Sequence, residues 1–183
     1  MDIIYDIARS DDHLKDILAL QQINLPHNIS ESEKESQGFV TVEHDFQLLK
    51  KMNNPWHHII ALDNEKLIGY ALVMLAELRE DIDILIPMFN EIDQAVKAHG
   101  NAFRYFVMGQ VCISKPYRGK GVFKGLYQHM RKCMQDHFDC VITEVDPLNK
   151  RSLRAHYKTG FRKLKSYMDS NKRPWELIIW DWN

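Results

Sequence analysis

The alternation of apolar and polar positions along the chain predicts strands and helices in a regular order. Apolar runs of strand length lie at residues 3–7, 57–62, 67–76, 103–113, 140–145, 162–167 and 175–180. Apolar side chains recur at helical spacing in residues 13–23, 42–52, 84–99, 122–138 and 149–159. Strands alternate with helices in the second half, and strands separated by short turns favour antiparallel pairs. We therefore predict an α/β or α+β fold with a mixed, mostly antiparallel sheet of about seven strands flanked by helices.

Several helix ends carry residues that favour capping. Ser10 and the two aspartates after it offer N-caps for the first helix. Asn149 is expected to cap the last helix, and Gly160 to follow its C-terminus. Pro87 is harder to place, because it falls in the first turn of the helix at 84–99 or interrupts that helix.

The most apolar strand, residues 103–113, reads FRYFVMGQVCI. Such a run is expected in the centre of a sheet, where both faces are covered. Gly109 interrupts it, and a glycine inside a strand often marks a bulge or a close approach of a ligand to the backbone. A glycine that only makes room for packing is the alternative interpretation.

Length and composition indicate a globular chain. The 183 residues are expected to form a single domain, 1–183, because a chain of this length buries about 70% of its unfolded surface. No apolar run reaches the ~18 residues of a membrane helix, and the N-terminus lacks the pattern of a signal peptide. We therefore expect a cytoplasmic protein without a membrane partner.

The cysteines do not form a disulfide or metal pattern. Cys112, Cys133 and Cys140 are odd in number and lack CxxC spacing. We expect all three to be reduced thiols in the core, and we expect no metal site.

Charge is distributed unevenly, although the net charge is only −1. Residues 1–93 hold 18 acidic and 7 basic residues, whereas residues 94–183 hold 7 acidic and 17 basic ones. This asymmetry favours an anion site in the C-terminal half. It also predicts that the acidic N-terminal half attracts a cationic amine substrate. A solvated basic face is the simpler alternative. Nucleic acid is not expected as a partner, because the chain as a whole is not basic.

One turn, KPYRGKGVFK at residues 115–124, concentrates cations and glycines between a strand and a helix. The first amides of a helix have no partner within it, and the helix dipole adds positive charge there. Gly119 and Gly121 allow backbone angles that side chains forbid, and Arg118 can bind a phosphate through two parallel hydrogen bonds. The turn therefore predicts a phosphate site, with an ordinary solvated turn as the alternative. Neither the Rossmann nor the P-loop pattern fits it.

Residues 118–122, RGKGV, resemble the acyl-CoA pyrophosphate loop of the GNAT superfamily of N-acyltransferases. The family pattern is Arg or Gln, two residues, Gly, one residue, and then Gly or Ala. Arg118 and Gly121 match this pattern, and Phe123 departs from it. A second segment, NKRSLRAHYKTGF at residues 149–161, resembles the other cofactor-proximal segment of the family. The two segments have the order and separation that the family shows.

The resemblance implies a GNAT-like fold and an N-acetyltransferase that uses acetyl-CoA as its co-substrate. In such an enzyme a small-molecule or peptide amine attacks the thioester directly in a ternary complex. The end of the long apolar strand would contact the pantetheine and the oxyanion, and the turn would hold the pyrophosphate. The cofactor-binding residues that the resemblance implies are Val111, Cys112, Ile113, Arg118, Gly119, Lys120, Gly121, Val122, Phe123, Lys124, Asn149 and Ser152.

Many family members protonate the leaving thiolate with a tyrosine four residues before the glycine of the Gly-Phe pair. The corresponding residue in this chain is His156. At about 100° per residue, His156 shares one helix face with Asn149 and Ser152. Tyr157 falls on the face that is expected to pack. His156 is therefore the candidate acid, and a contact to the cofactor is the alternative.

The general base is less clearly marked. Glu77, after the third strand, and Glu144, in the fifth, can each hold a water that accepts the amine proton. Two other classes of protein stay open: a non-catalytic acyl-CoA sensor or scaffold of the same fold, and a nucleotide-binding domain. The acceptor, the acyl chain length and the oligomeric state, with a homodimer among the options, also stay open.

Overall fold

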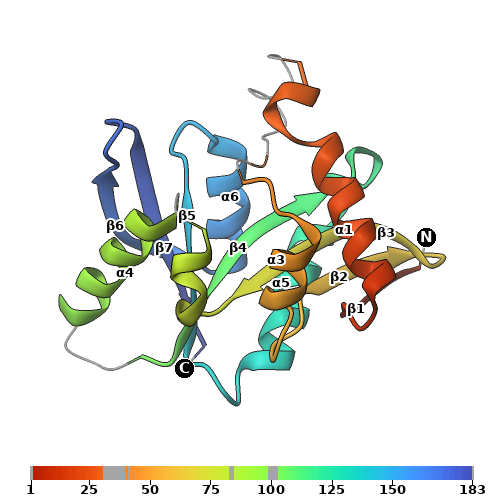
Figure 1. Cartoon of the computed structure of the whole chain (residues 1–183), viewed down its shortest axis with the longest axis horizontal. Helices are drawn as coiled ribbons and strands as arrows, with labels where there is room; N and C mark the ends of the chain where they lie inside the picture. The colour runs from red at the N-terminus through yellow and green to blue at the C-terminus, as the bar shows by residue number, and fades with distance from the viewer. Residues whose placement is uncertain (1, 31–39, 41, 83–84, 99–102, 183) are drawn as a thin grey trace. The chain divides into compact units, whose positions relative to one another are not determined.

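The computed structural model describes residues 2–30, 40, 42–82, 85–98 and 103–182 (Figure 1). Its strands are β1 (Ile3–Ile7), β2 (Ile59–Asp63), β3 (Lys66–Met74), β4 (Tyr105–Ile113), β5 (Cys140–Val145), β6 (Arg162–Met168) and β7 (Pro174–Asp181). Its α-helices are α1 (Asp11–Ile23), α3 (Phe46–Met52), α4 (Ile86–Ala98), α5 (Val122–Met134) and α6 (Lys150–Thr159). Short 3-10 helices are η1 (Pro26–Asn28), η2 (Ala76–Asp81) and η4 (Lys115–Tyr117).

The seven strands form a mixed sheet in the order β1-β2-β3-β4-β5-β7-β6. β4 and β5 run parallel, whereas the pairs β1–β2, β2–β3, β5–β7 and β6–β7 are antiparallel. The predicted mixed sheet flanked by helices is therefore confirmed. The chain packs as two compact units. Unit 1 comprises Met1–Val73 and Met108–Cys133, and unit 2 comprises Met74–Val107 and Met134–Asn183.

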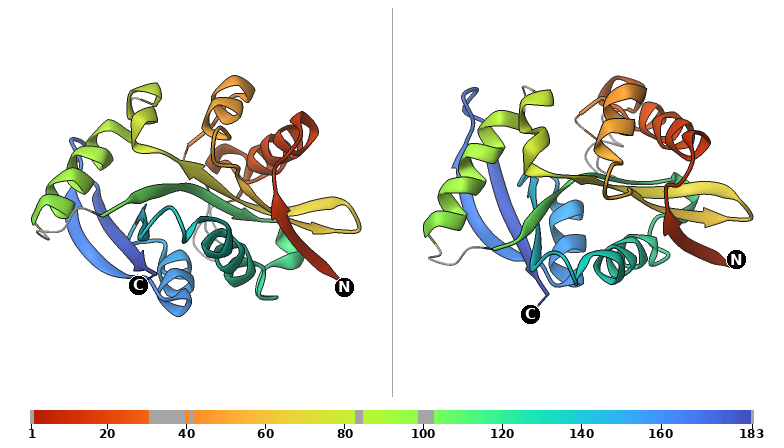
Figure 2. Two further views of the ribbon diagram at one scale, coloured as in Figure 1. Left: turned by 90° about the horizontal axis from the view of Figure 1, so that it is seen from below. Right: turned by 60° about the horizontal axis from the view of Figure 1, so that its bottom comes forward.

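Unit 1 is built on β1, β2, β3 and the C-terminal part of β4. α1 and α3 cover one face of these strands, and α5 covers the other (Figure 2). β3 is buried at every position after its first, as expected for a strand that is covered on both faces. Val122, Leu126 and Met130 are buried and recur every four residues, so they form the face of α5 that packs on the sheet.

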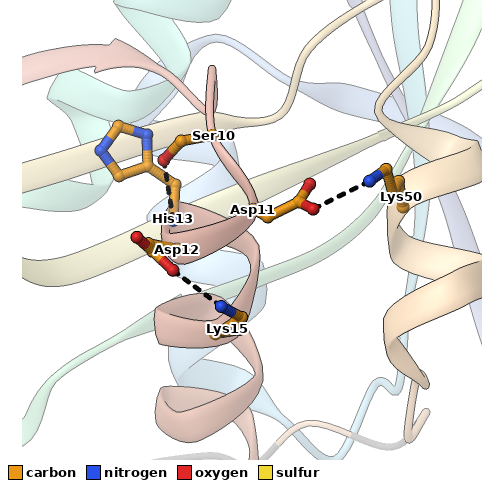
Figure 3. A network of polar contacts seen from close by, with 6 residues as sticks. All are labelled: Ser10, Asp11, Asp12, His13, Lys15 and Lys50. Carbon is orange, nitrogen blue, oxygen red and sulfur yellow. Dashed lines mark hydrogen bonds and ion pairs between the residues drawn. The ribbon is translucent and has the colours of Figure 1, made fainter.

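Polar contacts fix the start of α1 and tie this helix to α3 (Figure 3). The Ser10 hydroxyl accepts a hydrogen bond from the main-chain N–H of His13 at 3.2 Å, which confirms the predicted N-cap. Lys50 of α3 pairs with Asp11 of α1 at 2.8 Å. This pair is half exposed and therefore positions the two helices more than it stabilises them.

Two glycines allow α5 to approach the strands closely. A β-carbon on Gly69 of β3 would lie 3.2 Å from the main-chain oxygen of Cys112 and 3.4 Å from the side chain of Val122. A β-carbon on Gly125 of α5 would collide with the ring of Tyr5 on β1. The absence of both β-carbons lets the first turns of α5 lie directly on the sheet.

Unit 2 contains the N-terminal part of β4 together with β5, β7 and β6. α4 lies on one face of these strands and α6 on the other (Figure 2). On the α6 side, Phe161, Trp180, Trp182 and Phe106 follow one another with ring centroids 5.8 Å apart. This row of tilted and edge-on rings forms the core between α6 and the strands.

Two predicted helices are each four residues shorter in the structure. The helix expected at 42–52 begins at Phe46, because the side chain of Asp45 caps it by accepting a hydrogen bond from the main chain two residues into the helix. The helix expected at 122–138 ends at Met134. The 3-10 helix η2 after β3 was not indicated by the apolar pattern, because its six residues are too few to show a period.

α4 begins at Ile86, so Pro87 stands in its first turn, where a missing N–H removes no helical hydrogen bond. Positions 84 and 99 of the predicted helix lie outside the described residues. In the part of the chain that the structure describes, no helix is long and apolar enough to cross a bilayer.

The three cysteines are free thiols. Cys112 and Cys140 are buried, as predicted, but Cys133 is exposed. The prediction of a core position is wrong for Cys133, because the buried positions nearby in α5 are taken by Met130 and Met134. The described ranges contain no group of three or more His, Cys, Asp or Glu side chains arranged around a common centre.

Candidate functional site

The turn between β4 and α5 has an unusual backbone. Gly119 and Gly121 have φ angles of 78° and 85°, in the left-handed region that favours glycine, as the sequence predicted. A β-carbon built on either glycine would meet no atom of the described chain within 4 Å. The turn therefore leaves room for a ligand to approach its main chain.

Main-chain donors gather at this turn. Five main-chain N–H groups of the turn and the helix start have no acceptor among the described residues: those of Gly119, Lys120, Gly121, Val122 and Lys124. The first helical bond of α5 runs from the N–H of Gly125 to the oxygen of Gly121 at 3.0 Å. The helix start carries partial positive charge, and the exposed Lys120 and Lys124 add to it. This arrangement can bind the oxygen atoms of a phosphate.

The side chain of Arg118 binds other parts of unit 1. Its Nε donates to the main-chain oxygen of Ile113 at 2.9 Å, and its Nη2 donates to Oδ1 of Asn24 at 2.5 Å. These bonds connect the turn to the end of β4 and to the residue that follows α1. In this structure the guanidinium therefore supports the shape of the turn as well as contributing charge to it.

Val111, Cys112 and Ile113 are the last residues of β4. Burial raises the pKa of the Cys112 thiol to about 12, so this cysteine is a packed thiol and not a nucleophile at neutral pH. Gly109 lies inside the continuous strand β4. The described ladder between β4 and β5 pairs only Tyr105–Val107 of β4, and beyond it the Ile113 oxygen accepts from Arg118.

The ends of α6 are closed as the sequence predicted. Oδ1 of Asn149 accepts a hydrogen bond from the main chain of Ser152 at 3.1 Å. Gly160 has a φ of 122° after the last helical residue. A β-carbon on Gly160 would lie 2.7 Å from Nε1 of Trp180, so the helix end packs directly on β7.

His156 is buried on α6 and is held by one turn of its own helix. Its Nδ1 lies 2.8 Å from the main-chain oxygen of Ser152 and 3.3 Å from the hydroxyl of the same residue. A carbonyl oxygen only accepts, so Nδ1 carries the proton and Nε2 is the unprotonated nitrogen. Its ring meets Phe161 edge-on, with centroids 5.0 Å apart. Burial lowers the pKa of His156 to about 4, so the ring is neutral at pH 7.

This state of His156 does not favour the expected acid role. A neutral imidazole whose Nε2 lacks a proton can accept a hydrogen bond from a ligand, but it cannot protonate a thiolate through that nitrogen. The prediction that Tyr157 takes the packing face is wrong, because His156 is 1% exposed and Tyr157 is 40% exposed. The Tyr157 hydroxyl donates to Glu176 of β7 at 2.7 Å instead.

Glu144 lies on β5 and accepts a hydrogen bond from the hydroxyl of Tyr167 on β6. Burial raises the pKa of Glu144 to about 7, although the hydrogen bond from Tyr167 lowers it. Asp169 adds a smaller upward shift by charge repulsion. A carboxyl group that titrates near neutral pH is suited to accept and release a proton under physiological conditions.

Glu144 and His156 belong to opposite faces of the strands in unit 2. Glu144 pairs with Leu177 across the ladder, and side chains alternate along a strand, so it lies on the face opposite to Glu176. Glu176 binds Tyr157 of α6, the helix that carries His156. Glu144 is therefore on the face that α4 covers (Figure 2).

The second candidate base, Glu77, lies in η2 and is exposed. Its surroundings do not hold the carboxylate in a low-dielectric site, whereas those of Glu144 do. Of the two candidates, Glu144 has the environment that suits a general base.

Sequence reasoning missed two groups of polar residues. Tyr167 gave no signal, because its partner is distant in the sequence.

In unit 1 the buried Gln110 of β4 accepts from Tyr70 at 2.6 Å and from Gln21 at 2.9 Å, and it donates to the oxygen of Val42 at 2.7 Å. Gln21 in turn accepts from the main chain of His44 at 2.8 Å. This network fastens the segment before α3 to the sheet.

Comparisons with solved structures support the fold. A chain in the crystal structure of the NatC complex bound to Gag peptide and CoA has 17% identity to this chain and a TM-score of 0.68, with 100% of each chain covered. The ribosomal-protein-S18-alanine N-acetyltransferase of Escherichia coli has 10% identity and a TM-score of 0.63 over 98% of this chain and 94% of that one. A chimeric spermidine N-acetyltransferase from Vibrio cholerae has 12% identity and a TM-score of 0.59 over 99% and 96%.

A search of curated proteins found no match. The family model described as the acetyltransferase (GNAT) family matches residues 19–161, a span that includes the turn at 118–121 and the whole of α6. The resemblance seen in the sequence is thereby confirmed. This chain belongs to the acetyltransferase (GNAT) family.

Proposed function

We propose that this protein transfers an acetyl or short acyl group from acyl-CoA to a primary amine by direct attack in a ternary complex. The observation that carries the proposal is the turn at 118–121, where two left-handed glycines and a series of main-chain donors without acceptors meet the start of α5. These groups fit the pyrophosphate of coenzyme A. The end of β4 supplies main-chain groups for the pantetheine and the thioester oxygen.

In the proposed reaction, the amine nitrogen bonds to the thioester carbonyl carbon and the carbon–sulfur bond breaks. The acceptor starts as an ammonium group, which gives one proton to the Glu144 carboxylate before the attack, directly or through one water, and loses the second proton to solvent as the amide forms. The sulfur leaves as a thiolate and takes its proton from solvent. A free thiol has a pKa of about 8.5, so this leaving group does not require an acid such as His156.

His156 has a different role in this proposal. Its buried ring packs edge-on against Phe161, and its Nδ1 donates to the main-chain oxygen of Ser152. The family tyrosine at this position donates a proton, whereas this histidine holds α6 in place by packing. The proposal therefore assigns the proton transfer to Glu144.

The titration of Glu144 favours a peptide α-amine over a lysine-type amine as acceptor. An α-ammonium group has a pKa of about 8 and a lysine-type ammonium about 10.4. The pKa of Glu144 is about 7, so it lies about one unit below that of an α-ammonium group and about three units below that of a lysine-type ammonium group. Proton transfer to Glu144 is therefore less uphill from the α-ammonium group. Two of the similar structures named above point the same way: the NatC complex is bound to Gag peptide, and the Escherichia coli enzyme is named for acting on ribosomal protein S18.

Two measurements test the proposal. Calorimetry compares acetyl-CoA with adenine nucleotides that lack pantetheine, and we expect acetyl-CoA to bind much more tightly. Thiol release from acetyl-CoA is then followed with short peptides that have free α-amines and with spermidine, and mass spectrometry detects the acetylated acceptor. No binding of acetyl-CoA would contradict the proposal. Equal binding of the nucleotides would indicate a nucleotide-binding domain instead.

A non-catalytic acyl-CoA sensor or scaffold is the alternative function. It is favoured by His156 in place of the family tyrosine and by Phe123 in the turn. Tight binding of acetyl-CoA without thiol release on any amine would support it. Thiol release that requires an amine would exclude it.

A further inference from the structure

We propose that Tyr167 is a positioning residue, which holds the Glu144 carboxylate in the orientation that receives the proton of the acceptor amine. This inference rests on the proposed function, because it gives Glu144 the role of general base. It assigns a role to a residue outside both segments that resemble the family.

The two side chains meet above β7, the strand that separates β5 from β6. Tyr167 pairs with Trp175 of β7, and Glu144 pairs with Leu177 of the same strand. These two positions on β7 are two residues apart and share a face. β5 and β6 are about 10 Å apart, since neighbouring strands are about 4.8 Å apart. Only a long side chain such as tyrosine reaches across the intervening strand to Glu144.

The hydroxyl of Tyr167 has one use that the structure describes, the hydrogen bond to Oε2 of Glu144. The carboxylate is half-buried, and the donor from Tyr167 fixes its orientation and favours its charged form, against the larger opposite effect of burial. Phenylalanine has the same ring without the hydroxyl, so the substitution removes only the donor. The hydroxyl is therefore separable from the fold.

The other charged groups near the pair already have partners. Asp169, in the turn after β6, accepts hydrogen bonds from the main chain of Asn171 and Arg173 at 2.8 and 2.9 Å and from Nε1 of Trp175 at 3.1 Å. Glu91 of α4 faces Tyr167 and forms an ion pair with Lys165 of β6. Neither carboxylate competes for the Tyr167 hydroxyl, so its effect falls on Glu144.

The test is the titration of Glu144 in Tyr167→Phe. Glutamate carboxyl carbons are labelled with ¹³C and followed by NMR across about pH 5–9, and Glu144→Gln assigns the signal. Loss of the donor destabilises the carboxylate, so the midpoint is expected to rise by about one pH unit. Tyr157→Phe is the matched control, because it removes a tyrosine hydroxyl from a carboxylate on the other face of the same strands. It should leave the midpoint unchanged.

Turnover supplies a second readout. In Tyr167→Phe, kcat is expected to fall about five-fold at pH 7 and to recover at higher pH, following the shifted midpoint. A purely structural role would lower kcat equally at all pH values. If kcat of Glu144→Gln equals that of the wild type, the proposed base is wrong, whatever the NMR titration shows. If the midpoint is unchanged in folded Tyr167→Phe, the positioning role is wrong, even if the enzyme is active.

A measurement on the unmutated protein covers the case in which Tyr167→Phe does not fold. Tyrosine Cζ carbons are labelled with ¹³C, and the Tyr167 signal is expected to move with the same midpoint as the Glu144 carboxyl. A Tyr167 signal that does not respond to the titration of Glu144 overturns the inference.

Discussion

The ring of Tyr5 on β1 occupies the space where a β-carbon of Gly125 on α5 would lie. The contact sets the distance between the helix and the edge strand of unit 1. It also brings α5 down onto the sheet directly after the turn that carries the proposed cofactor-binding groups.

Gly125→Ala is expected to destabilise the protein by about 2 kcal/mol, because overpacking costs more than the ~1 kcal/mol that alanine gains in a helix. Urea unfolding measures the change. In a Tyr5→Ala background the same substitution should become neutral or stabilising, since the colliding ring is gone. Equal losses in both backgrounds would mean that Tyr5 does not set this distance.

The burial of His58 is expected to lower the free energy of unfolding in acid. It is fully buried; its Nδ1 accepts from the main chain of Val73 at 3.0 Å and its Nε2 bonds to the oxygen of Leu49 at 3.1 Å. Burial lowers its pKa to about 3. Below about pH 6.5, His58 therefore binds a proton in the unfolded chain but stays neutral in the folded chain. The free energy of unfolding falls as the pH drops from there towards 3.

Between pH 7 and pH 4 the contribution of His58 to this loss is expected to be about 3 kcal/mol. His58→Gln keeps one acceptor and one donor without a titration, so its free energy of unfolding should depend less steeply on pH. His27→Gln, at an exposed position, is the control and should keep the wild-type slope. Identical slopes for all three proteins would contradict the prediction.

Gly121→Ala tests the turn as a cofactor site. A side chain makes the left-handed backbone cost about 1–2 kcal/mol, so the main-chain donors would leave the arrangement seen here. The dissociation constant for acetyl-CoA is expected to rise about ten-fold by calorimetry. Lys132→Ala, exposed and near the far end of α5, should bind as the wild type does. Unchanged affinity in Gly121→Ala would place the pyrophosphate elsewhere.

Glu144→Gln decides between the two candidate bases. It should lower kcat by a factor of about 10² and abolish the rise in activity through pH 7, while acetyl-CoA still binds. Glu77→Gln is the paired variant, and its kcat should stay near that of the wild type, because Glu77 is exposed. If kcat instead falls in Glu77→Gln and not in Glu144→Gln, the proton acceptor is Glu77.

The features that the sequence predicted well are local ones. The left-handed backbone at Gly119 and Gly121 and the caps at Asn149 and Gly160 depend on residues within one turn of each other. Their chemistry is visible in a short stretch of sequence, because few other residue types fit such positions. The alternation of strands and helices is also local, which is why the sheet was predicted with nearly the correct elements.

The features that the sequence did not predict depend on distant partners. Helical spacing gives the angle between His156 and Tyr157 but not which of them faces the sheet; Phe161 and Trp180 decide that. Glu144 and Tyr167 are 23 residues apart and on strands that do not pair directly. No local pattern connects such positions, so Glu144 could be named as a candidate base but its partner could not.

The bond between Arg118 and Asn24 joins positions 94 residues apart. Asn24 is itself fixed, because its Nδ2 donates to the main-chain oxygen of Leu20 at 2.8 Å. A designer who grafts residues 115–124 into another scaffold of this fold must therefore carry over the end of the first helix as well. The transplantable module is two separate pieces of chain, and a graft of the contiguous decapeptide alone would lack its anchor.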